Sequence, residues 1–305
     1  MEDVLLAAVR AIMAADTVTN PKTELKTHWK GTAIPGPRAP GESVTEFSSV
    51  PVDQSFDSLS GHYKIFQYKE GHRFSTDDLL TAWYGTLCAP APLRVLDLGS
   101  GIGSVGMVAA WRLQGAKFVT VEAQEISVEL AKKSARYNGL ENRYEIRTGD
   151  FRDPKVLPES EKFDLILGSP PYFPLDSGLH AEHEQKVACR FEVRGSIHDY
   201  CLTAAKHLAL GGVFACVFPI SPPHQEQRMR DAAHAAELSI FRRRDVILKE
   251  DEPPLLGLFS MVQKSDRPES MYRQLWHEPP LTIRRADGSV HPEYSVIKMS
   301  IGFGP

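Results

Sequence analysis

The chain has 305 residues, of which 42% are hydrophobic and 24% are charged, and its formal net charge is -4. The composition is that of an ordinary soluble globular protein, and the length accommodates one α/β domain of about two hundred residues with extensions. The negative charge argues against a nucleic-acid surface that extends over the whole chain. Binding of RNA would therefore require a local basic patch or a partner.

The first 60 residues differ from the rest of the chain. Asp3 to Ala15 has the apolar spacing of a short helix, and acidic Glu2 and Asp3 argue against a targeting presequence. The apolar run is far too short to span a membrane. Residues 19–51 are rich in Pro, Gly, Ser, Thr and charge, as in a linker or an arm that orders on binding. We expect a partly flexible N-terminal extension over residues 1–60, a folded domain over residues 61–305, and a cytoplasmic protein without membrane contact.

The first strand of the domain leads into a glycine-rich loop. Residues 94–106 read Arg-Val-Leu-Asp-Leu-Gly-Ser-Gly-Ile-Gly-Ser-Val-Gly, which predicts a strand, a ligand-binding loop and a helix to about Gln114. The glycines let a ligand approach the backbone, and the helix N-terminus behind them is electropositive. The predicted ligand-binding glycines are Gly99, Gly101 and Gly103.

The same loop satisfies the dinucleotide fingerprint, so an NAD enzyme is an alternative. Asp97 discriminates between the two ligands, because a carboxylate at the end of the strand repels a pyrophosphate and attracts a cation. S-adenosylmethionine carries both an ammonium and a sulfonium, and Asp97 therefore favours it as the cofactor.

The next two strands also end in acidic residues. A strand over residues 118–122 ends in Glu122, where a carboxylate can bind the two ribose hydroxyls of a cofactor. The helical spacing of apolar residues then predicts a helix from Ile126 to Asn138. A strand over residues 144–148 leads to Asp150 and Phe151. We expect Asp150 to accept a hydrogen bond from the adenine amine and Phe151 to pack on the adenine ring.

The segment from Phe163 to Phe173 runs from an apolar strand into Ser169-Pro170-Pro171-Tyr172. Two successive prolines fix the backbone and cannot donate hydrogen bonds, so nearby carbonyls stay free to accept from an NH2 group. Tyr172 offers a stacking face. The segment therefore suits a planar amine such as a nucleobase.

Beyond this loop the pattern of alternating helices and strands continues. It predicts helices over residues 198–210 and 223–236, a strand over 213–218, an antiparallel pair over 238–248 and 257–263 at the sheet edge, and a last strand-like segment at 281–283. We expect an α/β, Rossmann-like fold, with a seven-stranded mixed sheet flanked by helices and ligands at the carboxyl ends of the strands.

Three further features of the sequence could form sites. Arg242 to Arg244 forms a local basic cluster that either contacts phosphates or is solvated. The pair His180 and His183 superficially suggests metal ligands, but no cysteine or second acid–histidine group lies near it, so we assign no metal. The four cysteines are widely spaced and indicate neither a zinc site nor a disulfide framework.

With these motifs in place, residues from about Gly71 to Met299 resemble a class I S-adenosylmethionine-dependent amino-methyltransferase. The chain is most similar to the bacterial tRNA1(Val) adenine-N6 methyltransferase family. Besides the glycine loop and the Pro-Pro-Tyr motif, the resemblance includes Arg73-Phe-Ser-Thr-Asp-Asp-Leu-Leu-Thr-Ala-Trp83. In that family the corresponding segment lies against the methionine part of the cofactor, which implies such a role for Thr76 and Asp77.

The resemblance implies methyl transfer to an exocyclic base amine, most readily adenine N6 of a tRNA or rRNA. The catalytic residues would be Ser169, Pro170, Pro171 and Tyr172, and the base would stack on Tyr172 and Phe173. One departure bears on the chemistry: most members have Asn where this chain has Ser169, and a hydroxyl both donates and accepts. Two alternatives remain, a protein glutamine-amide N-methyltransferase and a catalytically degenerate adaptor domain.

Overall fold

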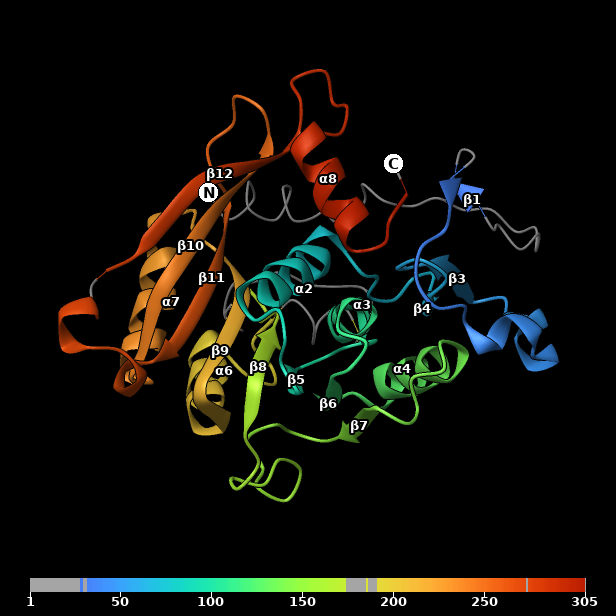
Figure 1. Cartoon of the computed structure of the whole chain (residues 1–305), viewed down its shortest axis with the longest axis horizontal. Coiled ribbons are helices and arrows are strands. Elements are labelled where there is room, and N and C mark those ends of the chain that lie inside the picture. The colour runs from blue at the N-terminus through green and yellow to red at the C-terminus, as the bar shows by residue number, and fades with distance from the viewer. Residues whose placement is uncertain (1–27, 30–31, 174–184, 186–190, 273, 305) are drawn as a thin grey trace.

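The computed structural model describes residues 28–29, 32–173, 185, 191–272 and 274–304. Within them, eight strands form one mixed sheet in the order β12-β10-β11-β9-β8-β5-β6-β7 (Figure 1). In chain order the strands are β5 (Arg94–Leu98), β6 (Lys117–Glu122), β7 (Tyr144–Thr148), β8 (Phe163–Gly168), β9 (Leu208–Pro219), β10 (Leu238–Lys249), β11 (Leu256–Gln263) and β12 (Trp276–Arg284). Strand β11 runs antiparallel to β9 and β10, and the other neighbouring strands are parallel.

The predicted α/β, Rossmann-like architecture is confirmed, with eight strands in place of seven. The extra strand is β12, which pairs in parallel with β10 from Trp276 to Arg284 and takes the edge position expected for the β10–β11 pair. Its first half contains Pro279 and Pro280. Proline lacks the N–H that a strand donates and is tolerated at sheet edges, so the sequence pattern concealed all but the last residues of this strand.

Six helices flank the sheet in the described part of the chain. They are α2 (Thr76–Cys88), α3 (Ser104–Arg112), α4 (Glu125–Tyr137), α6 (Ile197–His207), α7 (Pro223–Ala235) and α8 (Pro292–Ser300). Helices α2, α3, α4 and α8 lie on one face and α6 and α7 on the other (Figure 1). Because right-handed crossovers place helices on opposite faces where the strand order reverses, the reversal between β5 and β8 opens a crevice at the carboxyl ends of these strands.

Helix α4 shows how the sequence pattern sets the packing and where it misleads. Its buried side includes Val128, Leu130 and Ala131, which recur at helical spacing and face the sheet. Ile126, expected on the same side, is 38% exposed. It lies in the first turn of the helix, where the polar Ser127 is buried in its place.

The described part of the N-terminal extension packs on the domain, whereas a linker or an arm was expected for residues 19–51. Two short 3-10 helices, η1 (Pro40–Ser43) and η2 (Thr45–Ser48), precede the hairpin of β3 (Gln54–Ser58) and β4 (Lys64–Tyr68). The ring of Phe47 is buried and meets Tyr137 of α4 edge to face, with 5.2 Å between the ring centroids. The short pair of β1 (His28–Trp29) and β2 (Thr32–Ala33) comes before them. The helix predicted at Asp3 to Ala15 lies outside the described residues.

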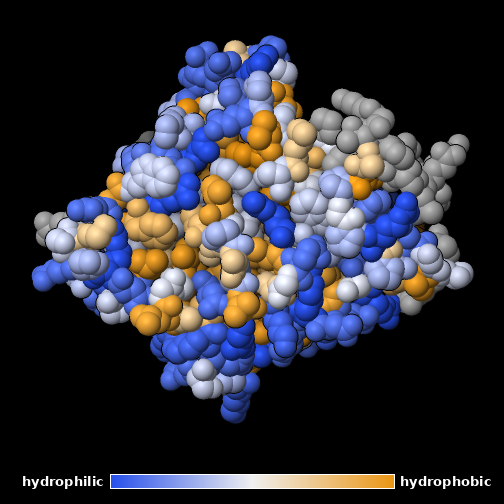
Figure 2. All heavy atoms as spheres, in the orientation of Figure 1, coloured by the Kyte–Doolittle hydropathy of each residue, from blue (hydrophilic) through white to orange (hydrophobic). Residues whose placement is uncertain are grey.

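The helices and the surface can be compared with what a membrane span requires. None of the described helices is long and apolar enough to cross a bilayer. Figure 2 shows hydrophilic and hydrophobic residues interspersed over the face in view.

The arginine cluster of β10 is engaged in ion pairs within the protein. The guanidinium groups contact carboxylates of β10 itself and of neighbouring elements, namely Arg242 with Glu278, Arg243 with Glu226 and Asp245, and Arg244 with Glu293. The Arg242–Glu278 pair is nearly buried and has two hydrogen bonds, of 2.7 and 2.9 Å. The cluster therefore joins the sheet edge to the helices, and its charge is already neutralised.

Replacing Glu278 by Ala is expected to lower the free energy of unfolding by about 3 kcal/mol, because it leaves the nearly buried Arg242 without its partner. Urea unfolding measures the change. Glu252→Ala, in the exposed turn between β10 and β11, is the control and should change little. Equal stability of the two variants would show that the pair contributes nothing to the sheet edge.

Candidate functional site

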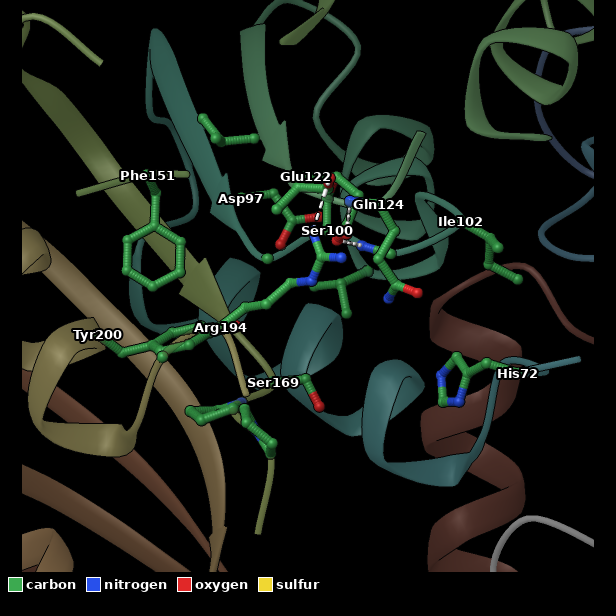
Figure 3. A pocket seen from close by; sticks show the side chains of 18 of the residues that line it. His72, Asp97, Ser100, Ile102, Glu122, Gln124, Phe151, Ser169, Arg194 and Tyr200 are labelled. Carbon is green, nitrogen blue, oxygen red and sulfur yellow. Dashed lines mark hydrogen bonds between the residues drawn. The ribbon is translucent and has the colours of Figure 1, made fainter. Parts of the chain in front are cut away.

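The carboxyl ends of β5, β6, β7 and β8 and the start of α2 enclose a pocket (Figure 3). Since the four strands are parallel, the residues that follow them meet at one edge of the sheet. Most of the sequence-predicted site residues line this pocket: Asp77, Asp97, Gly99, Gly101, Glu122, Asp150, Phe151, Ser169, Pro170, Pro171, Tyr172 and Phe173. The structure thus brings together residues that are up to 96 positions apart in the sequence, from Asp77 to Phe173.

Two of the predicted residues lie behind the pocket wall. The hydroxyl of Thr76 lies 3.4 Å from the hydroxyl of Tyr294, on the side of α8. Gly103 is the N-cap of α3 with a φ of 88°, and a Cβ atom there would lie 2.9 Å from the methyl group of Met107. Gly103 is therefore required by the turn into α3, while Gly101, with a φ of 54°, has open space on the side of its missing Cβ.

Asp97 lies at the end of β5, and only one of its two carboxylate oxygens is hydrogen-bonded within the described structure. Its Oδ2 accepts a 2.9 Å hydrogen bond from the backbone N–H of Gly106. Its Oδ1 is buried and has no partner among the described residues. Burial raises the pKa of Asp97 well above its ordinary value. A carboxylate in this setting favours a ligand that brings a positive charge or a hydrogen-bond donor.

Glu122 ties the glycine loop to the end of β6. Its Oε2 accepts a 2.8 Å hydrogen bond from the N–H of Gly101, and its Oε1 accepts one of 2.6 Å from the N–H of Gln124. Burial raises its pKa. A carboxylate has about four acceptor positions, so the remaining ones can receive the hydroxyls of a ribose.

Asp150 is the predicted site residue whose carboxylate is already occupied. The guanidinium of Arg152 binds it in a fork, with distances of 2.9 Å from Nε to Oδ1 and 2.6 Å from Nη2 to Oδ2. Arg152 also lowers the pKa of Asp150. An adenine amine would therefore share this carboxylate with Arg152. Phe151 lies nearby, buried, with its ring edge to face against Tyr200 at a centroid distance of 4.8 Å.

Two adjacent aspartates open helix α2, and the sequence analysis identified only the first as a site residue. Asp78 accepts hydrogen bonds from the N–H of Ser75, at 3.1 Å, and from the hydroxyl of Ser104, at 3.0 Å. It thereby joins the N-termini of α2 and α3 in the wall of the pocket. Burial raises the pKa of Asp77 to about 6 and that of Asp78 to about 7, where the charge of Asp77 adds to the effect. The capping box formed by Ser75 and Asp78 was the available sequence signal.

Tyr172 is fixed from three sides. Its hydroxyl donates a 2.5 Å hydrogen bond to Oδ2 of Asp77, and its ring meets Phe218 of β9 edge to face at 5.9 Å. Its carbonyl accepts hydrogen bonds from Gln225 and Arg228 of α7, at 3.3 and 3.2 Å. Only 6% of its surface is exposed. The Pro-Pro-Tyr loop is thus a rigid wall of the pocket, tied to α2 on one side and α7 on the other.

Ser169 presents its side chain to the pocket. In Figure 3 the hydroxyl points toward the space between the end of β8 and His72. No hydrogen bond from this hydroxyl to another described residue is found, and the side chain is partly exposed. Phe173, by contrast, is buried, with its ring against Phe191 at 6.0 Å.

Three buried oxygen atoms of the pocket have no hydrogen-bond partner in the described part of the chain. They are Oδ1 of Asp77, Oδ1 of Asp97 and Oγ of Ser100. Buried polar atoms without partners are rare, and each costs stability unless a ligand or water completes it. Their position between the glycine loop and α2 fits a ligand with a cationic, hydrogen-bond-donating end, such as the amino-acid part of S-adenosylmethionine.

The family assignment comes from comparison with known proteins. Residues 84–236, half of the chain, match the family model described as "Methyltransferase small domain". The chain belongs to this family. A solved predicted O-methyltransferase from Agrobacterium tumefaciens superposes with a TM-score of 0.54 at 18% identity, over 75% of this chain and 98% of that one. The class I methyltransferase fold and S-adenosylmethionine as the cofactor are thereby confirmed, and the NAD alternative is set aside.

Two curated relatives are similar over shorter stretches. The tRNA1(Val) (adenine(37)-N6)-methyltransferase of Porphyromonas gingivalis is 31% identical over 151 residues, which are 48% of this chain and 58% of that protein. The release factor glutamine methyltransferase of Aliivibrio fischeri is 37% identical over 83 residues, 27% of this chain and 28% of that protein. The chain therefore spans little more than half of the first relative and about a quarter of the second.

The segment with His180 and His183, to which no metal was assigned, lies outside the described residues.

Replacing Asp97 by Asn is expected to weaken binding of S-adenosylmethionine by about ten-fold or more, the loss expected for a charge-assisted hydrogen bond. The amide oxygen still accepts from the Gly106 N–H, so the loop should keep its shape. Titration calorimetry with S-adenosylmethionine and S-adenosylhomocysteine measures the effect. Asp251→Asn, in the exposed turn after β10, is the matched control. An unchanged affinity would remove Asp97 from the cofactor site.

Replacing Asp78 by Asn is expected to stabilise the protein without cofactor by a few kcal/mol at pH 8 and to change little at pH 4. The folded pKa of about 7 lies above the value of about 3.9 in an unfolded chain, so folding takes up a proton between these pH values. The stability linked to protonation of Asp78 is fully present below about pH 3.9 and is lost as the pH rises from there through 7. Urea unfolding at both pH values tests this. A variant that is less stable than the parent at pH 8 would contradict it.

Proposed function

We propose that this protein transfers the methyl group of S-adenosylmethionine to an exocyclic base amine of RNA, namely adenine N6 of a tRNA or rRNA. The observation that carries the proposal is the position of Ser169-Pro170-Pro171-Tyr172 beside the glycine loop. Strands β8 and β5 pair in parallel with Gly168 opposite Leu98, so the two motifs begin at the same level of adjacent strands. An amine held by the first motif is therefore brought next to a cofactor held by the second.

Positioning is the main contribution that these residues make. The amine of a nucleobase is a poor nucleophile because its lone pair is delocalised into the ring. The hydroxyl of Ser169 and the carbonyl of Pro170 would accept hydrogen bonds from the two amine hydrogens and favour a pyramidal nitrogen. The bound cofactor supplies an activated methyl group on its sulfonium, so the pocket requires orientation and electrostatic complementarity more than a strong base.

The burial of Tyr172 refines the role expected for this residue. Its ring is packed on Phe218 and its hydroxyl is bound to Asp77, so it contributes an edge of the wall and rigidity to the loop. A base must leave its stack to reach such a wall, which is easier in an RNA loop than in a duplex. The curated relative from Porphyromonas gingivalis is named for adenine methylation of a tRNA, which supports the RNA class of substrate.

A protein glutamine amide is the second candidate substrate. A planar amide has the shape and the donors of an aromatic amine, and the Aliivibrio fischeri relative is named a release factor glutamine methyltransferase. The negative net charge of the chain is compatible with a protein substrate. The paired state of Arg242 to Arg244 also removes one of the two basic clusters that the sequence offered for phosphates, the other being Arg284 and Arg285.

Nucleoside mass spectrometry distinguishes the candidates. RNA from cells that lack the protein is digested, and the loss of one methylated adenosine, restored by adding purified protein and S-adenosylmethionine, is expected. The Asp97→Asn variant is the control that should restore less. A methyl group found on a protein glutamine, with the RNA nucleosides unchanged, would replace the RNA proposal by its alternative, and absence of cofactor binding would leave an adaptor domain.

Replacing Ser169 by Ala is expected to lower the rate of methyl transfer by roughly ten- to a hundred-fold, as loss of one hydrogen bond in the transition state implies. Ser169→Asn keeps an acceptor and should retain activity. Single-turnover rates at saturating cofactor measure both. An alanine variant as fast as the parent would show that the hydroxyl only fills space and that the Pro170 carbonyl alone binds the amine.

A further inference from the structure

Arg194 stands apart from the other residues of the pocket. It is the one lysine or arginine among the described residues that line it, in a wall otherwise rich in carboxylates. Its Nη1 donates a 2.9 Å hydrogen bond to the carbonyl of Ala123, directly after β6. No motif in the sequence marks this residue, because it lies in the connection that leads to α6.

The neighbours of Arg194 locate it at one end of the pocket. The next residue, Gly195, lies against the ring of Phe151, where an added Cβ would be 3.0 Å from the ring. The side chain therefore spans from the loop after β7 to the loop after β6, as Figure 3 shows. Ser169 lies at the end of β8, which β5 separates from β6. Arg194 is thus on the side of the pocket away from the proposed amine.

The charges around Arg194 agree with this position. Burial raises the pKa of Glu122, and the charge of Arg194 opposes that rise. Arg152 lowers the pKa of Asp150, and Arg194 adds to that effect. Arg194 therefore lies near both acidic residues expected to contact the ribose and the adenine, at the adenosine end of the pocket.

The chemistry of a guanidinium suits this end of the cofactor. It is planar and always charged, and it stacks on the flat face of an aromatic ring. The side chain is exposed and held by a single hydrogen bond to a carbonyl in the described structure, so it can move as a ligand enters. The adenosine end offers a flat purine, while the only anionic group of S-adenosylmethionine is the carboxylate at its methionine end.

We propose that Arg194 is a cofactor-binding residue that closes the adenosine end of the pocket, with its guanidinium stacked on the adenine. This proposal depends on S-adenosylmethionine being the cofactor, and it holds whether the methyl acceptor is RNA or protein. It also explains why a cation stands in a pocket whose other charged residues are carboxylates: the positive charge of Arg194 favours the ionised forms of Glu122 and Asp150.

Binding of three ligands to Arg194→Ala tests the proposal. Titration calorimetry with S-adenosylmethionine, S-adenosylhomocysteine and 5′-methylthioadenosine is expected to show the same loss of affinity, about five- to ten-fold, for all three. The last ligand lacks the amino-acid part, so an equal loss places the contact on the adenosyl group. An unchanged affinity for methylthioadenosine would overturn the proposal, whether or not the other two ligands bind more weakly.

Two further variants complete the design. Arg194→Lys keeps the charge but not the planar group, and it should bind methylthioadenosine as weakly as the alanine variant; full recovery by lysine would reduce the contact to charge alone and contradict stacking. Arg285→Ala, an exposed arginine in the turn before α8, is the control and should bind like the parent. A failed search for methylated RNA leaves these binding results standing, so the two proposals fail separately.

Discussion

The burial of carboxylates at the carboxyl edge of the sheet is the constraint on which the rest of the site depends. Asp97 accepts a backbone N–H bond from the start of α3, and Glu122 accepts one from the glycine loop. Asp78 bridges the first turns of α2 and α3. Each bond positions a loop that has little apolar surface of its own. The same carboxylates then present their remaining oxygen atoms to the pocket, so structure and ligand binding use one set of side chains.

This double use has an energetic consequence. Burial raises the pKa of Asp77, Asp78 and Asp97, which means that the charged forms needed for a cationic ligand are unfavourable in the folded chain. A bound ammonium and sulfonium offset that cost. Binding of the cofactor and ionisation of the pocket should therefore be coupled, and part of the affinity for the cofactor comes from relief of an unfavourable arrangement in the protein itself.

The sequence predicted the parts of the fold and site that depend on local pattern. The buried parallel strands β5 and β8 are apolar runs in the sequence, so their positions could be predicted. The acidic and proline residues at their ends could be predicted as site residues because ligands of such folds bind at the carboxyl ends of the strands. Only the last residues of β12 were predicted, because its prolines conceal the rest, and the pairing of Arg242 to Arg244 was not predicted, because it depends on contacts between distant elements. Asp78 and Arg194 were not predicted as site residues. Asp78 acts through a hydrogen bond between two helices and Arg194 spans two loops, and neither arrangement leaves a periodic pattern in the sequence.

The hydrogen bond between Tyr172 and Asp77 gives the site a property that neither motif predicts alone. Asp77 belongs to helix α2, which lines the proposed cofactor site, and Tyr172 belongs to the loop that we propose holds the target amine. Because Oδ2 of Asp77 is bound to Tyr172 while its Oδ1 has no partner in the described structure, a donor on the cofactor would pull on the same carboxylate that fixes the loop. Asp77 is therefore the side chain that joins the proposed cofactor site to the wall proposed to hold the amine.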